Sequence, residues 1–76
     1  MGNFTTTLIE VDDDGELLEM ADGTLFEIEP ADTPTVILWV ESAQIEISLS
    51  PGTAWTHVLV NRSNGQKVRA VRTTPQ

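Results

Sequence analysis

Short stretches of alternating apolar and polar residues recur along this chain, and they predict β-strands. The alternation is clearest in TLIEV, LFEIE, QIEIS and VRAV, and it has the period of strands with one buried face. Gly, Asn or Asp separate these stretches, and no segment carries a long helical stripe. We therefore expect strands near residues 5–11, 16–20, 24–29, 44–49, 56–61 and 67–72.

Three hairpin turns are predicted, at Asp14-Gly15, Asp22-Gly23 and Asn64-Gly65. A shift of one residue moves every side chain to the other face, so the apolar pattern selects the register. It favours a two-residue loop at the first turn and three-residue loops over 21–23 and 63–65. The expected pairs are Val11 with Leu18, Ile9 with Met20, Leu18 with Phe26, Met20 with Thr24, Val60 with Val68, and Val58 with Ala70. The expected core is Ile9, Val11, Leu18, Met20, Phe26, Ile28, Ile45, Ile47, Leu49, Val58, Val60, Val68 and Ala70.

The segment EPADTPTVILWVES, residues 29–42, joins the two groups of strands. Asp32 is placed to cap a single helical turn that begins near Thr33, because proline is tolerated at the first helical position. Val36 and Trp39 would then point inward and plug one end of a small barrel. The alternative is a further strand through TVILWV, which is rich in β-branched residues. We favour the helical turn.

The chain of 76 residues is long enough for one domain with a small core. A domain of this size buries only about 60% of the surface that its unfolded chain exposes. The strand pattern and the single turn together predict an all-β fold. We expect a small SH3-like or OB-like barrel of five to six antiparallel strands with one short helical turn, ordered over about residues 5–72 of a single domain, 1–76.

Composition excludes several classes of function. Cysteine is absent, which excludes a disulfide framework, a thiolate metal site and a thiol nucleophile. The longest apolar run, VILWV, is far shorter than the about 20 residues that span a bilayer, and no secretory signal precedes it. We expect no cofactor, no membrane partner, and a monomer or weak homo-oligomer. The cytoplasm is the expected compartment, and a mature exported protein that has lost its signal is the alternative.

Charge is unevenly distributed along the chain. All 12 carboxylates lie between Glu10 and Glu46, and the four Lys and Arg residues lie in the C-terminal part, giving a formal net charge of −8. This balance argues against nucleic acid, whose phosphates would be repelled. The asymmetry indicates either a charged partner or a C-terminal hairpin that folds against the acidic strands.

The stretch DGTLFEIEPAD, then Trp39, then LVNRSNGQKVRAVR resembles the shared pattern of a group of small uncharacterised bacterial β-barrel proteins. That pattern places Asp-Gly before a bulky residue and Glu, then Pro and Asp, then Trp, and closes with Leu-x-Asn, Gly and Val-x-Ala. The matching residues are Asp22, Gly23, Phe26, Glu27, Pro30, Asp32, Trp39, Leu59, Asn61, Gly65, Val68 and Ala70. Phe26 stands where the pattern has tryptophan, and Ser42-Ala43 replaces a Gly-Asp pair. The resemblance implies a compact barrel and no catalytic residues.

The acidic run VDDDG, residues 11–15, has two interpretations. In a calcium loop Asp12 and Asp14 would hold the third and fifth positions, but Ala21 stands at the twelfth, where a bidentate glutamate is needed. Asp-Gly is also the ordinary hairpin signal. We favour the turn, and we keep Asp12, Asp13 and Asp14 as candidates for weak binding of divalent cations.

No enzymatic constellation emerges. His57 is the only imidazole, and it lacks the companions that nucleophilic catalysis or a zinc site needs. Glu10 and Glu19 should face each other on the outer face of the first hairpin, but so small a chain offers no cleft for glycosidase chemistry. We therefore expect a protein that is not an enzyme.

The leading hypothesis is an interaction module that binds a protein partner through a sheet edge or a barrel end. Trp55 follows the loop sequence SPGTA, where an aromatic ring can serve as a stacking platform or as a lid over the core. If the last strand lies at an edge, its cations could attract an acidic peptide that adds a strand. The candidate partner-binding residues are Trp55, His57, Lys67, Arg69 and Arg72. The alternative is small-ligand or divalent-cation binding by the acidic turns.

Overall fold

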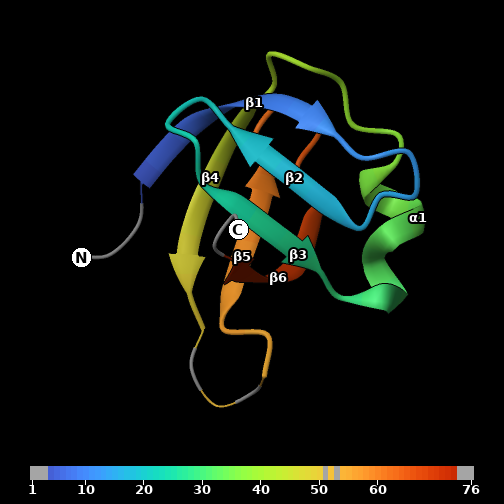
Figure 1. Ribbon diagram of the computed structural model, residues 1–76. Helices are drawn as coiled ribbons and strands as arrows, with labels where there is room; N and C mark the ends of the chain where they lie inside the picture. Colours follow the sequence, from blue (N-terminus) through green and yellow to red (C-terminus); the bar gives the residue numbers. More distant parts are fainter. Residues whose placement is uncertain (1–3, 51, 53, 74–76) are drawn as a thin grey trace.

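The computed structural model describes residues 4–50, 52 and 54–73, which form a closed barrel of six antiparallel strands (Figure 1). The strands are β1 (Phe4–Val11), β2 (Leu17–Met20), β3 (Leu25–Ile28), β4 (Gln44–Leu49), β5 (His57–Asn61) and β6 (Lys67–Thr73). A 3-10 turn, η1 (Pro30–Asp32), and a single turn of helix, α1 (Thr33–Val36), connect β3 to β4. The prediction of an all-β barrel with one short helical turn is confirmed.

Two three-stranded meanders build the barrel. Around it the strands follow the order β1-β2-β3-β6-β5-β4, so that each meander contributes three consecutive neighbours. The first half of β1 pairs with β4 and the second half pairs with β2, while β3 pairs with β6. These two contacts, β1–β4 and β3–β6, close the sheet. Within the described residues every strand therefore has a neighbour on both sides.

The registers of the first two hairpins largely follow the prediction. Val11 lies opposite Leu18, and Leu18 lies opposite Phe26. Thr24 closes the β2–β3 loop, because its carbonyl accepts the Met20 N–H at 2.9 Å. The pairing of Ile9 with Met20 is wrong. A bulge between Leu8 and Glu10 places Leu8 opposite Met20 and leaves Ile9 exposed.

The predicted register of the last hairpin is wrong. Leu59 lies opposite Val68, while Val60 lies opposite Lys67 and Val58 opposite Arg69. The connecting loop spans residues 62–65, one residue more than predicted, and the Asn61 N–H donates to the Gln66 carbonyl across it. Side-chain oxygens stabilise this longer loop: Asn61 Oδ1 accepts the Ser63 N–H, and Asn64 Oδ1 accepts the Gln66 N–H, each at 2.9 Å.

The core lies inside the barrel and under α1. Its buried members are Leu8, Leu18, Met20, Phe26, Ile28, Val36, Trp39, Ala43, Ile45, Ile47, Leu59, Val68 and Ala70. Five residues that the pattern placed in the core are not fully buried. Ile9 and Leu49 are exposed, Val58 and Val60 are half-buried, and Val11 is half-buried but packs against the core. Leu59 replaces the two valines because of the register shift. The last residue of β4, Leu49, is 63% exposed; it pairs with His57 of β5, but the described pairs with β1 end at Ile47.

The helical turn closes one end of the barrel, as predicted, and the alternative of a strand through residues 35–40 is wrong. Val36 and Trp39 point inward and are buried, and Trp39 Nε1 donates to Gln66 Oε1 at 2.9 Å. Asp32 occupies the N-cap position but makes no capping hydrogen bond. Its Oδ2 instead accepts the backbone N–H of Arg69 at 2.9 Å, which fastens the turn to β6.

We call the end that carries α1, the β1–β2 turn and the β5–β6 loop the helix end. The opposite end, which carries the β2–β3 turn and the β4–β5 connection, is the far end (Figure 1). None of the helices in the described part of the chain has the length and apolar character that crossing a membrane requires.

Candidate functional site

Three apolar side chains project into solvent from the segment that closes the helix end. Val36 and Trp39 point inward, so the neighbouring side chains of Ile37, Leu38 and Val40 point outward and are 47%, 75% and 65% exposed. Backbone hydrogen bonds hold the segment in place, with the Trp39 N–H donating to the Val36 carbonyl at 2.8 Å. We call Ile37, Leu38 and Val40 the apolar strip.

The β1–β2 turn packs directly beside the apolar strip. Gly15 is buried in the turn with a φ of +72°, a conformation that glycine adopts without strain. A β-carbon at this position would lie 2.8 Å from the carbonyl oxygen of Thr33 and 3.3 Å from Cβ of Ile37. The absence of a side chain at Gly15 therefore lets the acidic turn approach α1 closely.

Two hollows lie between this turn and the segment that closes the helix end, and each combines apolar side chains with carboxylates. The first, of about 440 Å³, is lined by Val11, Asp12, Asp13, Ile37, Trp39, Val40 and Glu41. The second, of about 350 Å³, is lined by Glu16, Leu17, Glu27, Ile28, Pro30 and Thr33. The apolar strip contributes Ile37 and Val40 to the first hollow, so the strip and this hollow form one continuous surface, with the second hollow on the other side of the turn.

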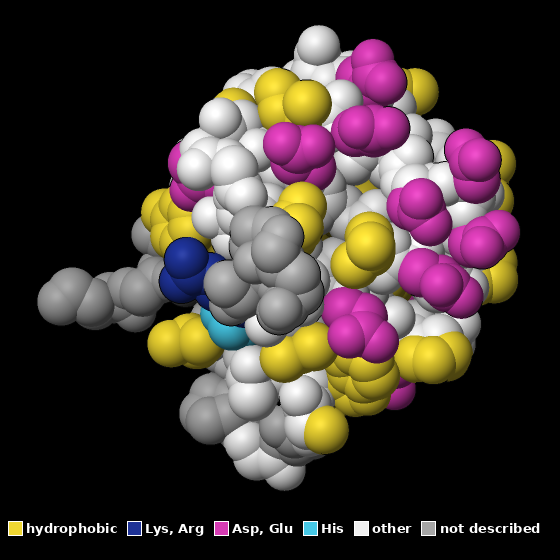
Figure 2. Space-filling model, viewed as in Figure 1, with side chains coloured by type: hydrophobic (Ala, Val, Ile, Leu, Met, Phe, Trp, Pro, Cys, Tyr) yellow, Lys and Arg dark blue, Asp and Glu magenta, His cyan; other side chains and the backbone are white. Residues whose placement is uncertain are grey.

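Carboxylates surround this surface, and they have no cationic partners among the described residues. We call the six of them the acidic rim: Asp12, Asp13, Asp14, Glu16, Glu27 and Glu41. All six are exposed, and none forms an ion pair with any residue that the structure describes. Figure 2 shows acidic side chains spread over the side of the molecule where Figure 1 has α1 and the β1–β2 turn, with apolar side chains between them.

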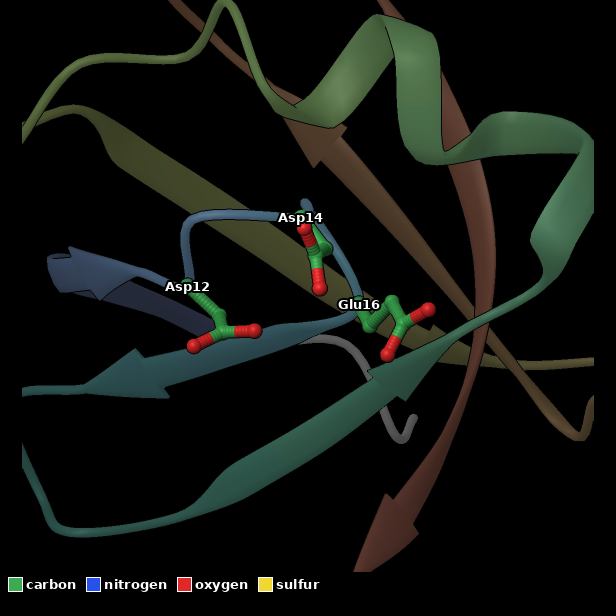
Figure 3. Close-up of side chains that lie close together, drawn as sticks. All are labelled: Asp12, Asp14 and Glu16. Carbon is green, nitrogen blue, oxygen red and sulfur yellow. The ribbon is translucent and has the colours of Figure 1, made fainter.

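Three members of the acidic rim converge within the β1–β2 turn (Figure 3). Asp12, Asp14 and Glu16 each place one carboxylate oxygen within 4.8 Å of the other two, and all three side chains are exposed. The sequence prediction included Asp12 and Asp14 but named Asp13, which is outside this group, and it missed Glu16. Asp12, Asp14 and Glu16 occupy every second position of the turn, and this spacing could have predicted that they converge. Calcium takes about six to eight oxygen ligands, so water would have to complete a site here.

The three candidate residues on β6 do not form one site. Lys67 and Arg69 line a hollow of about 380 Å³ near the helix end, with Asp32 and Val58. Arg72 lies opposite Phe26, toward the far end. The hypothesis that β6 is an edge strand open to an added peptide is wrong, because β6 pairs with β3 on one side and with β5 on the other.

His57 and Trp55 lie at or near the far end and are half-buried. The ring of His57 meets Phe26 edge to face, with centroids 5.3 Å apart, and its Nδ1 lies 3.1 Å from Oγ1 of Thr56. Burial lowers the pKa of His57 below its ordinary value, and the positive charge of Arg72 lowers it further. Both effects favour a neutral imidazole that packs as part of the barrel end.

Comparison with protein-family models, curated proteins and solved structures finds no significant match for this chain. The resemblance to the small bacterial barrels therefore stays a prediction, and the surface at the helix end is the feature that points to a function.

Proposed function

We propose that this protein is a non-enzymatic interaction module, an SH3-like or OB-like barrel that binds a protein partner through its helix end. The observation that carries the proposal is the apolar strip. Single exposed apolar residues are normal on soluble proteins, but three on one short segment beside a hollow are typical of an interaction site. Closure of the sheet supports side-chain recognition at a barrel end over the addition of a strand.

Site-specific photo-crosslinking tests this proposal with a matched pair of leucines. Leu38 at the helix end and Leu49 at the far end are 75% and 63% exposed, so a photoreactive residue at either position reaches solvent. In the native cells we expect discrete adducts of defined mass from position 38 and only a diffuse background from position 49. Equal adducts from both positions, or none from position 38, would contradict binding at the helix end.

A second candidate is weak binding of divalent cations by Asp12, Asp14 and Glu16. The convergence of three carboxylates within 4.8 Å favours it, while their exposure limits the affinity. We expect millimolar calcium or magnesium to raise the melting temperature only slightly, because stabilisation by a ligand reaches about 2.7 kcal/mol only at a hundredfold excess over Kd. Asp14→Asn should reduce this small shift, and Asp13→Asn, which leaves the three convergent carboxylates in place, should preserve it. A large, saturable shift with calcium alone would make the ion site the leading function.

A further inference from the structure

We infer that the partner segment bound at the helix end is a cationic amphipathic peptide, with lysine or arginine side chains close to apolar ones. The inference rests on the proposed function and specifies the chemistry of its partner. It comes from the combination of the apolar strip with the acidic rim on one surface.

Charge determines which partner this surface can accept. Any partner that covers the apolar strip also removes water from the carboxylates that line the hollows beside it, Asp12, Asp13 and Glu41 among them. Burying carboxylates without compensation is costly, and juxtaposing like charges across an interface disfavours binding further. A neutral or acidic segment would therefore be rejected, whereas a cationic segment would supply the ion pairs that the described part of this chain does not provide.

The short spacing between apolar and acidic side chains further restricts which partner segments can bind. Each hollow is lined by both apolar and acidic residues, so a partner needs cations and apolar groups within a few residues of each other. Lysine and arginine suit this arrangement, because their aliphatic stems can cover apolar surface while the charged group reaches a carboxylate. An amphipathic basic segment presents both features together.

A second copy of this chain fits the surface poorly. Docking two helix ends face to face would bring two acidic rims together in a protein that already carries a formal net charge of −8. Of the four Lys and Arg residues, Arg62 pairs with Glu46 at 3.1 Å, and Arg72 lies toward the far end. Lys67 and Arg69 line a hollow near the helix end, where they are two positive charges against the six carboxylates of the acidic rim. The charge layout thus favours a different, basic chain as the occupant.

Fluorescence anisotropy with designed peptides tests the inference. The probe is a labelled synthetic peptide of leucine and lysine arranged as an amphipathic helix, and two control peptides carry glutamate for every lysine or serine for every leucine. We expect saturable binding of the leucine–lysine peptide, which weakens as salt is added because exposed charges are screened. The glutamate peptide should not bind, and the serine peptide should bind at least about tenfold more weakly, since it lacks the apolar contacts.

Matched variants separate specific recognition from general attraction to an acidic protein. Asp13→Asn with Glu41→Gln removes two charges from the first hollow, and neither residue belongs to the convergent trio in the turn. Glu10→Gln with Glu19→Gln removes the same charge from the facing pair on β1 and β2, which lines a hollow that includes no residue of the segment closing the helix end. We expect the first double variant to weaken binding of the leucine–lysine peptide by about tenfold and the second by less than about twofold.

The outcomes distinguish failure of this inference from failure of the proposed function. Equal weakening in both double variants, or no binding of the leucine–lysine peptide, would overturn the cationic partner. If crosslinking at position 38 still gave discrete adducts in that case, the interaction module would stand with a partner of other chemistry. Light scattering tests whether a second copy of this chain is the partner. Self-association that is lost in Leu38→Ser but kept in Leu49→Ser would show that it is, and this result would also overturn the inference.

Discussion

The two ends of the barrel are closed by different means. At the helix end a dedicated segment, η1 with α1 and the residues that follow, inserts Val36 and Trp39 into the core. At the far end the closing groups come from the strands themselves, as in the contact of Phe26 with the His57 ring.

This difference shows that the segment closing the helix end has more apolar side chains than folding requires. Closing the helix end needs only the inward side chains of VILWV, yet its outward side chains Ile37, Leu38 and Val40 are apolar as well. Polar residues at these exposed positions would leave the buried contacts unchanged. The apolar strip is therefore best explained by contact with a partner, whereas the inward side chains of the far end, such as Phe26, are explained by the barrel itself.

The largest effect should come from removing the plug at the helix end. Trp39→Ala leaves a cavity and removes the hydrogen bond to Gln66, so we expect the free energy of unfolding to fall by about 3–5 kcal/mol. Leu38→Ala, on the same segment but pointing outward, should change it by less than about 0.5 kcal/mol. Urea denaturation measures both, and similar losses in the two variants would contradict the division into inward and outward faces.

Two glycines at opposite ends offer a second comparison. Gly15 and Gly23 both have positive φ, at +72° and +88°, so alanine is strained at either position. Only at Gly15 would the added Cβ also meet another segment, at 2.8 Å from Thr33 O. We expect Gly15→Ala to cost about 3 kcal/mol and Gly23→Ala about 1 kcal/mol, since overpacking adds to the backbone strain in the first case alone. Thermal unfolding would reveal equal losses if the turn did not pack against α1.

The two Asp-Gly turns should respond differently to loss of their aspartates. Asp22 Oδ1 accepts the Thr24 N–H at 2.9 Å, and this bond lowers the pKa of Asp22. Because the group is exposed, we expect Asp22→Ala to cost only about 0.5 kcal/mol. Asp14→Ala should cost nothing or stabilise slightly, because Asp14 lies close to the carboxylates of Asp12 and Glu16. A loss at Asp14 that matched the loss at Asp22 would contradict this contrast between the turns.

The smallest effect concerns pH at the far end. Burial and Arg72 lower the pKa of His57 in the folded protein below 6.5, its ordinary value in the unfolded chain. At a pH between the folded and the unfolded pKa, the unfolded chain therefore binds a proton more readily than the folded protein. Stability from this group is complete above pH 6.5 and declines as the pH falls through that window. We expect the stability of the wild type relative to His57→Gln to decrease from about pH 7.5 to about pH 5.5.

Titration of the single imidazole resonance checks the cause of that dependence. We expect Arg72→Gln to raise the pKa of His57 toward its ordinary value without reaching it, since burial is the larger cause. A pKa at or above the ordinary value in the wild type would contradict the packing of His57 at the barrel end.

Most of the strands and two of the registers could be predicted because the apolar pattern had one solution there. In β2 and β3 only one alignment buries Leu18 and Phe26 together. In β1 both Leu8 and Ile9 are apolar, so the pattern could not locate the bulge that buries the first and exposes the second. In β5 the run VLV is apolar on both faces, and the loop hydrogen bonds made by Asn61 and Asn64 decided the register.

The candidate site was harder to predict than the fold. The acidic turn was visible in the sequence, and Glu16 could have been included from its alternation with Asp12 and Asp14. The exposure of Ile37, Leu38 and Val40 depended on how the segment turns, because either a helical turn or a strand fits VILWV. The placement of Gly15 against Thr33 joins residues from different elements, which local patterns do not encode.

Closure of the barrel also has a consequence for the folding pathway. Four of the six strand contacts join consecutive strands, but β1–β4 and β3–β6 bring together residues as distant as Phe4 with Ile47 and Leu25 with Thr73. Long-range contacts form late because the entropy of the intervening chain must be lost first. Each meander can assemble locally, so the rate-limiting step is expected to be the docking of two preformed halves. The crossover through α1 is then the tether that keeps those halves within reach of each other.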